Sequence, residues 1–162
     1  LAMGYGLSKR EAELIRLAAP LHDVGKVGIP DAILNKPGPL TDEEWAIMQL
    51  HAEKGHLILK DSNRDIVNTG AVIALSHHER WDGSGYPKGL KGEDIPIAGR
   101  IVALADVFDA LRHKRCYKEP WSLDDVVKEI NAQQGKQFDP KLIDVFNQRI
   151  KEIEDVLVRY PD

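Results

Sequence analysis

The side chains with the most distinctive chemistry are imidazoles and carboxylates that recur along the chain. They form two adjacent pairs, His22-Asp23 and His77-His78, to which His51 and Asp106 are added. Such ligands suit Fe, Mn, Zn, Ni or Co, and the absence of cysteine from the set excludes a zinc-finger type of site. Because Asp106 has apolar neighbours in the sequence, we expect a buried carboxylate that needs a cation or several hydrogen-bond donors.

A carboxylate shared between two histidine-rich half-sites is the arrangement that a two-metal hydrolase needs. Two metals about 3.5–4 Å apart acidify a bridging water and stabilise both the entering and the leaving oxygen of a phosphoryl displacement. Lys26 follows His22 by four residues, one turn if the helix continues, and can neutralise a phosphate oxygen. Arg115 and Lys118 offer cations for a second phosphate. The pattern therefore predicts a hydrolase whose ligand carries two phosphates.

Capping patterns predict that helices position these residues. Ser8 with Glu11, and Thr41 with Glu44, have the form of capping boxes, and apolar residues at helical spacing follow both. Ser122 opens a further helix in the same way. These starts indicate that the ligand-bearing segments are helices or the ends of helices.

Proline and glycine predict where the helices bend and end. Pro20 lies inside the first helix and should bend it just before His22, and Gly25 offers a stop. Gly55 is a candidate break in the helix that carries His51. A loop is expected over residues 79–96, where four glycines and two prolines gather.

The remaining chain also has helical patterns. Asp65 can cap a helix that ends near His78, a buried helix is expected from Ala98 to about Leu111, and Pro140 begins the last helix. The charged stretch 148–159 is amphipathic and can cover the core or form a homodimer interface. No alternating run is long enough to predict a strand. The expected class is all-α, with one domain over residues 1–162.

Length and composition restrict the function further. The 162 residues, the 43% hydrophobic share and the net charge of −4 fit one globular domain and argue against wholesale binding of nucleic acid. Apolar runs reach only five residues, whereas a membrane span needs roughly 20. The single cysteine, Cys116, excludes an internal disulfide and suits a reducing compartment, so a cytoplasmic location is expected. Residues 1–7 read like the tail of an earlier helix, which favours a fragment of a longer protein.

Four ordered motifs make the chain similar to the HD-GYP family, metal-dependent phosphodiesterases of the HD phosphohydrolase superfamily. The motifs are Pro20-Leu-His-Asp-Val-Gly-Lys26, His51, His77-His-Glu-Arg-Trp-Asp-Gly-Ser-Gly-Tyr-Pro87 and Ala105-Asp-Val-Phe-Asp-Ala-Leu111. The likeness extends from Ser8 to about Phe146. It implies hydrolysis of the bacterial second messenger cyclic di-GMP to the linear dinucleotide or GMP.

The resemblance also implies a helical bundle around two divalent metals, with Fe expected and Mn or Zn as alternatives. Asp23 would bridge the metals, and Lys26 would face the phosphate beside them, which makes these two the expected catalytic residues. The implied metal ligands are His22, Asp23, His51, His77, His78 and Asp106.

Substrate and partner contacts follow from the same resemblance. Lys26, Arg115 and Lys118 would bind the dinucleotide, and the loop Gly85-Tyr86-Pro87 would lie at the mouth of the site. That loop is also the expected surface for diguanylate cyclase domains. An N-terminal regulatory domain is expected in the parent protein.

Some positions depart from the family pattern. Its members usually carry a Glu and a His on a helix upstream of the first motif, and residues before Ser8 supply neither, which leaves a third metal in doubt. Arg112 and His113 stand where small polar residues are common, and Cys116 stands where proline is common. An alternative function is therefore a module that binds cyclic di-GMP or a diguanylate cyclase without turnover.

Other notable residues have simpler interpretations. His56 and His113 are expected to be peripheral or solvated rather than ligands. Trp81 lies in the glycine-rich loop, and stacking of its ring on guanine is the functional alternative to a role in packing. A hydrolase acting on another nucleotide is disfavoured by the Gly-Tyr-Pro loop.

Overall fold

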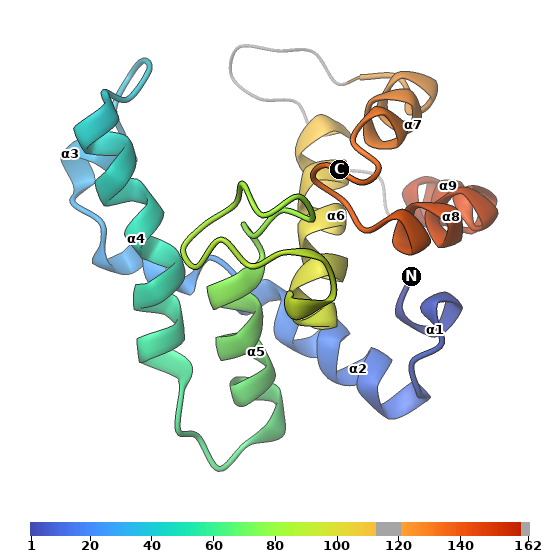
Figure 1. The fold of residues 1–162 in the computed structure, drawn as a ribbon, viewed down its shortest axis with the longest axis horizontal. Helices are drawn as coiled ribbons and strands as arrows, with labels where there is room; N and C mark the ends of the chain where they lie inside the picture. Colours follow the sequence, from blue (N-terminus) through green and yellow to red (C-terminus); the bar gives the residue numbers. More distant parts are fainter. Residues whose placement is uncertain (113–120, 160–162) are drawn as a thin grey trace.

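The computed structural model describes residues 1–112 and 121–159, and in these ranges the chain is helical and contains no strand (Figure 1). The α-helices are α1 (Ala2–Tyr5), α2 (Lys9–Ala18), α3 (Asp31–Leu34), α4 (Asp42–Leu59), α5 (Asp65–Ser76), α6 (Ile97–Arg112), α7 (Leu123–Ala132), α8 (Pro140–Gln148) and α9 (Ile150–Arg159). Three 3₁₀ helices join them: η1 (Ala19–Leu21), η2 (Val24–Gly28) and η3 (Gly92–Asp94). The predicted all-α class is confirmed.

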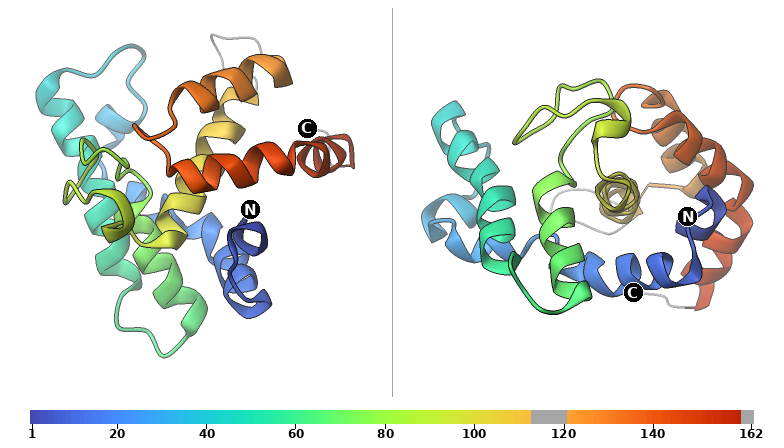
Figure 2. Two further views of the ribbon diagram at one scale, coloured as in Figure 1. Left: turned by 45° about the vertical axis from the view of Figure 1, so that its right-hand side comes forward. Right: turned by 60° about the horizontal axis from the view of Figure 1, so that its bottom comes forward.

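The hydrophobic core is built around α6, which Figure 2 shows end-on, with α2, α5, α7 and α8 around it. Apolar residues three or four apart give each surrounding helix one face toward α6. On α8, for example, Leu142 and Phe146 are fully buried. The buried side chains of this core are Ile15, Ala18, Ile73, Ala98, Ile101, Val102, Leu104, Val126, Ile130, Phe138, Leu142, Ile143 and Phe146.

The predicted capping boxes are present. The Ser8 hydroxyl accepts from the Glu11 amide, and the Glu11 carboxylate accepts from the Ser8 amide at 2.8 Å. Thr41 and Glu44 make the same reciprocal pair at the start of α4. These bonds fix the starts of α2 and α4 because they satisfy amides that have no partner within the helix.

The predicted bend at Pro20 is wrong, because α2 ends at Ala18 and the chain continues as η1. Proline lacks the amide that would bond to the carbonyl of residue 16, and its ring clashes with that carbonyl. The segment therefore tightens into a 3₁₀ turn, and His22-Asp23 lies between η1 and η2 rather than on a continuing helix.

Three other details of the predicted helices are wrong, although the expected helix starts at Asp65 and Pro140 are confirmed. Helix α4 runs unbroken through Gly55, which permits close packing against η2 instead of a kink. Asp65 makes no capping bond and pairs with Arg10 at 2.9 Å. Pro140 does begin a helix, but that helix is not the last, since α9 follows it after Arg149.

The site described below lies between α4, α5, α6 and η2. Helix α4 stands at the outer edge of the molecule and packs on α5 and η2, while α6 borders α5 from the core side (Figures 1 and 2). Within the described ranges, none of the helices is both long and apolar enough to cross a bilayer.

Candidate metal centre

Residues 22–25 form the turn that brings the first pair of predicted ligands to α4. Gly25 is buried against this helix, and a Cβ atom there would lie 1.9 Å from the His51 carbonyl oxygen and 2.4 Å from the Gly55 amide nitrogen. Only glycine permits this approach, since such distances are far inside van der Waals contact. The close packing places the Asp23 Oδ1 atom 3.4 Å from His51 Nε2.

Three of the histidines are oriented by backbone carbonyls. The Nδ1 atoms of His22 and His51 lie 2.9 Å and 2.7 Å from the carbonyl oxygens of residues 19 and 48, and His77 Nδ1 lies 3.0 Å from that of residue 74. An imidazole whose Nδ1–H donates to a carbonyl presents the lone pair of Nε2. All three rings therefore present Nε2 as the candidate ligand atom.

Four predicted ligands converge on one point. Ligand atoms of Asp23, His51, His77 and His78 all lie within 4.8 Å of one another. His77 Nε2 is 3.8 Å from Asp23 Oδ1, and His78 Nε2 is 3.1 Å from His51 Nε2.

Two atoms of this cluster test whether a cation fits. Asp23 Oδ1 and His77 Nε2 are buried and have no hydrogen-bond partner among the described residues. A buried polar atom without a partner costs about 1–3 kcal/mol, and a cation between these two would satisfy both. The donor set, three imidazoles and a carboxylate, is one that Fe, Mn and Zn accept. The residues therefore fit a divalent metal.

The electrostatics favour the metal-binding protonation states. Burial, reinforced by the neighbouring imidazoles, lowers the pKa of His77 to about 4 and that of His78 to about 3, so both rings are neutral at pH 7. Burial alone would raise the pKa of Asp23, but contacts with His22 and Lys26 outweigh it and hold that pKa below its usual range. Neutral imidazoles and an ionised carboxylate are the forms that bind cations.

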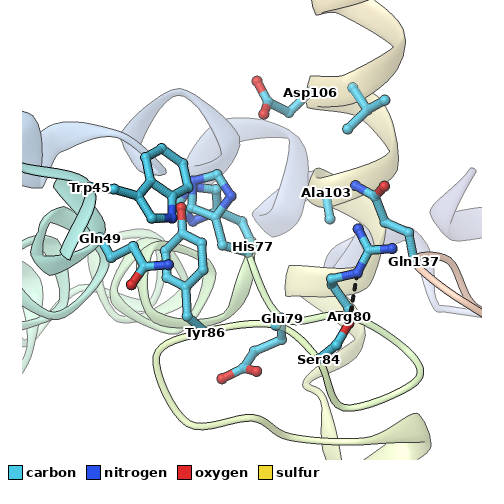
Figure 3. Close-up of a pocket in the computed structure, with 13 residues that line it drawn as sticks. Trp45, Gln49, His77, Glu79, Arg80, Ser84, Tyr86, Ala103, Asp106 and Gln137 are labelled. Atoms are coloured by element: carbon cyan, nitrogen blue, oxygen red, sulfur yellow. Dashed lines mark hydrogen bonds between the residues drawn. The ribbon is translucent and has the colours of Figure 1, made fainter. Parts of the chain in front are cut away.

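His22 and Asp106 lie beside this cluster of four. His22 Nε2 is 3.3 Å from Asp23 Oδ2 and 3.6 Å from Asp106 Oδ1, and the hydrogen bonds to Asp106 and Asp23 raise the pKa of His22 to about 10. Unlike His77 and His78, this ring must therefore release a proton before Nε2 can bind a cation. The predicted burial of Asp106 is wrong, because 39% of its side chain is exposed. Its apolar sequence neighbours cover the core face of α6, whereas Asp106 points from α6 toward the cavity (Figure 3).

Lys26 reaches the centre by a route other than the predicted one. It lies on η2, three residues after Asp23, and its ammonium group pairs with Asp23 Oδ2. The other two predicted cations, Arg115 and Lys118, lie outside the described residues, as do His113 and Cys116.

The Gly-Tyr-Pro loop covers one side of the histidine cluster. The Tyr86 ring stacks on His78 with 4.7 Å between centroids, and the Tyr86-Pro87 peptide is cis. A Cβ atom at Gly85 would lie 2.3 Å from the Arg80 amide nitrogen, so the loop can fold back only with glycine there.

Trp45, Gln49 and Gln137, which line the adjacent cavity, were not among the predicted site residues. This cavity of about 380 Å³ is bounded by Trp45, Gln49 and Tyr86 on one side and by Arg80 and Gln137 on the other (Figure 3). The suggestion that Trp81 stacks on a base gains no support, because its ring packs against the Arg100 guanidinium, with 5.7 Å from the guanidinium carbon to the ring centroid.

The profile of the HD domain family matches residues 1–142. The chain belongs to the HD domain family. This membership accounts for the His22-Asp23 pair at the turn before η2, and the expected relationship to the HD-GYP enzymes is confirmed by its relatives.

This HD domain is similar over its whole length to curated bacterial phosphodiesterases. It is 52% identical to 3′3′-cGAMP-specific phosphodiesterase 2 of Vibrio cholerae and 51% identical to a cyclic di-GMP phosphodiesterase of Thermotoga maritima, over 162 residues in each case. It is 49% identical over 156 residues to the cyclic di-GMP phosphodiesterase response regulator RpfG of Xanthomonas campestris. The chain spans 31%, 44% and 41% of these three proteins, less than half of each.

A solved structure shares the fold of the HD domain. A cyclic GMP-AMP specific phosphodiesterase of Vibrio cholerae aligns with a TM-score of 0.69 at 24% identity, over 96% of this chain and 42% of that one. At this level of identity the likeness concerns the arrangement of the helices.

Proposed function

We propose that this HD domain is the catalytic part of a metal-dependent phosphodiesterase that hydrolyses cyclic di-GMP to the linear dinucleotide, GMP or both. The observation that carries the proposal is the convergence of Asp23, His51, His77 and His78, in which two buried ligand atoms have no hydrogen-bond partner in the described part of the chain. The names of relatives about 50% identical over the whole chain support the substrate.

The residues that would hold the metals have distinct roles. His51, His77 and His78 bind from α4 and the end of α5, His22 and Asp106 bind from the opposite side, and Asp23 lies between the two groups. When bound, a pair of divalent ions supplies Lewis-acid activation of a phosphodiester and lowers the pKa of a water molecule. We propose two ions, Fe in preference to Mn or Zn.

The protein supplies positioning and charge for the phosphodiester. The Lys26 ammonium group, held beside Asp23, is placed to neutralise a non-bridging phosphate oxygen. Tyr86 covers His78 and limits the entry of bulk water to the histidine cluster. Arg115 and Lys118 remain proposed contacts to the distal phosphate.

Partners and a location in the cell are also proposed. The Gly85-Tyr86-Pro87 loop is a proposed surface for diguanylate cyclase domains, and a homodimer is proposed as the assembly. The name of RpfG, a response regulator, supports a regulatory domain in the parent protein. A cytoplasmic location is proposed from the single cysteine.

Metal content paired with turnover tests the proposal. After loading with Fe(II) or Mn(II), we expect about two metals per chain and hydrolysis of cyclic di-GMP. Asp23→Ala should abolish both, whereas Asp144→Ala, the same change at an exposed site on α8, should abolish neither. Bound metal without turnover would instead support a module that binds the dinucleotide.

A further inference from the structure

Two cavities share Trp45, Tyr86 and His78 in their walls. The first, here called the polar cavity, has a volume of about 380 Å³ and is lined in part by Gln49, Arg80 and Gln137. The second, the apolar cavity, has a volume of about 310 Å³ and is lined by Lys26, Leu34, Leu40, Met48 and His51, together with the same ring pair. The rings meet edge to face, 6.3 Å apart.

The polar cavity contains hydrogen-bonding groups that the described part of the protein does not use. The side-chain amides of Gln49 and Gln137 make no hydrogen bond to any described residue. Arg80 donates from Nε to the Ser84 hydroxyl at 3.0 Å, and the same nitrogen lies 3.9 Å from Asp82 Oδ1. The terminal nitrogens of Arg80 make no hydrogen bond in the described ranges. Figure 3 shows Arg80 and Gln137 on the wall opposite Trp45 and Tyr86, so a planar ligand between the walls would meet both rings and donors.

These groups match the edges of guanine. The guanidinium of Arg80 carries only donors, and guanine presents two acceptors, O6 and N7, to such a group. The amides of Gln49 and Gln137 each offer an acceptor for the N1–H and N2–H groups of guanine. Adenine places an amino group where guanine has O6, and Arg80 offers no acceptor for it. Trp45 is 48% exposed and closes the side of the cavity opposite Arg80.

Among the described residues, the lining of the apolar cavity is mostly hydrophobic and offers fewer groups that could distinguish one purine from another. Leu34, Leu40 and Met48 carry no hydrogen-bond donor of useful strength, so they contact the faces of guanine and adenine equally well. Lys26, the charged residue of this cavity, is paired with Asp23 and lies on the phosphate side.

We propose that the two bases of a cyclic dinucleotide are recognised unequally: the polar cavity selects guanine, and the apolar cavity accepts either purine. This inference rests on the proposed function and deepens it. The amides of Gln49 and Gln137 and the guanidinium of Arg80 are the specificity-determining groups.

Comparison of three substrates tests the asymmetry. For the metal-loaded chain, kcat/KM for cyclic di-GMP and 3′3′-cGAMP should agree within about tenfold. The value for cyclic di-AMP should be roughly 10- to 100-fold lower, which is the discrimination expected when one base is recognised by hydrogen bonds. Equal turnover of all three would overturn the proposal. So would rejection of 3′3′-cGAMP, because it would mean that both cavities read guanine.

Replacing the side chains of Gln49 and Gln137 tests whether they recognise guanine. Gln49→Leu and Gln137→Leu keep the approximate size and remove no hydrogen bond within the described protein. Each should raise KM for both guanine-containing substrates by about tenfold, leave kcat for cyclic di-GMP nearly unchanged and narrow the gap to cyclic di-AMP. The control is Gln148→Leu, at an exposed position of α8.

A substrate without bases separates this inference from the proposed function. The ratio of kcat/KM for cyclic di-GMP to that for bis(p-nitrophenyl) phosphate should fall in both leucine variants, since neither amide is hydrogen-bonded to a described metal ligand. Equal loss on all substrates would instead indicate a phosphate contact or a damaged fold and would overturn base reading.

Binding measurements test the recognition of the bases even if the chain does not catalyse hydrolysis. Wild-type chain that hydrolyses none of these compounds would refute the proposed function. Calorimetric titration with phosphorothioate analogues of the same dinucleotides would then still test recognition: weaker binding of the adenine-only analogue supports the proposal, and equal or absent binding overturns it.

Discussion

Replacing Gly25 by alanine should separate the Asp23 turn from α4. The substitution adds one methyl group, at a position where that atom would lie 1.9 Å from the His51 carbonyl oxygen and 2.4 Å from the Gly55 amide nitrogen. Both neighbours are backbone atoms of α4, so no side chain can move aside. The backbone conformation of Gly25 does not itself demand glycine, because its φ lies outside the left-handed region, and the effect is therefore purely steric.

The size of the effect follows from the overlap. A normal contact needs about 3.0 Å or more, so η2 must move away from α4 by roughly 1 Å. Overpacking of this kind costs typically 1–3 kcal/mol, and the rigid backbone on both sides places Gly25→Ala near about 3 kcal/mol. For a chain of this length that corresponds to a melting temperature lower by roughly 6–12 °C. The same movement carries Asp23 away from His51, which now lies 3.4 Å from it, and should weaken metal binding about 10- to 100-fold.

Gly28→Ala provides the matched control on the same 3₁₀ helix. Its added methyl group would meet the Cδ atom of Lys54 at 2.9 Å, near the end of a flexible side chain that can rotate away. We expect a loss below about 1 kcal/mol in urea unfolding of the metal-free chain, followed by circular dichroism. Wild-type stability and metal affinity in Gly25→Ala would refute the reasoning, as would equal damage in both variants.

Three further replacements test the supports around the site. Glu79 is 4% exposed, and its carboxylate accepts hydrogen bonds from two loop amides at 2.8 Å and 2.9 Å. Glu79→Gln should therefore loosen the Gly-Tyr-Pro loop and raise KM for cyclic di-GMP several-fold, with no change in metal content. Loss of metal would contradict this prediction. Asp139 pairs with the buried Arg100 guanidinium at 2.7 Å, and Asp139→Asn would weaken this ion pair. The free energy of unfolding in urea should fall by about 3–5 kcal/mol. An unchanged unfolding midpoint would refute the prediction. Thr41→Ala removes the cap of α4 and should cost about 1 kcal/mol by the same measurement, without changing the kcat for cyclic di-GMP.

Most helix starts could be predicted from the sequence because their causes are local. A capping box involves residues three apart, as Ser8 and Glu11 illustrate, and its geometry depends on little else. Interruptions were harder to predict. Pro20 was expected to bend a helix that it ends, and Gly55 was expected to break a helix that runs straight through it. The function of a glycine depends on which backbone approaches it, and for Gly55 that partner is 30 residues earlier, at Gly25.

The sequence by itself determined which chemistry is available: imidazoles, a carboxylate pair and a lysine in an order typical of HD domains, on segments whose helical nature follows from local patterns. Only the tertiary structure decided how they are used. It brought ligands from the turn before η2, from α4 and from the residues just after α5 within 4.8 Å of one another. It also left Asp106 partly exposed and added Trp45, Gln49 and Gln137 as walls of an adjacent cavity. The physical reason is that these groups meet across contacts between helices, and such contacts depend on packed surfaces remote in sequence, whereas capping and periodicity act within a single turn.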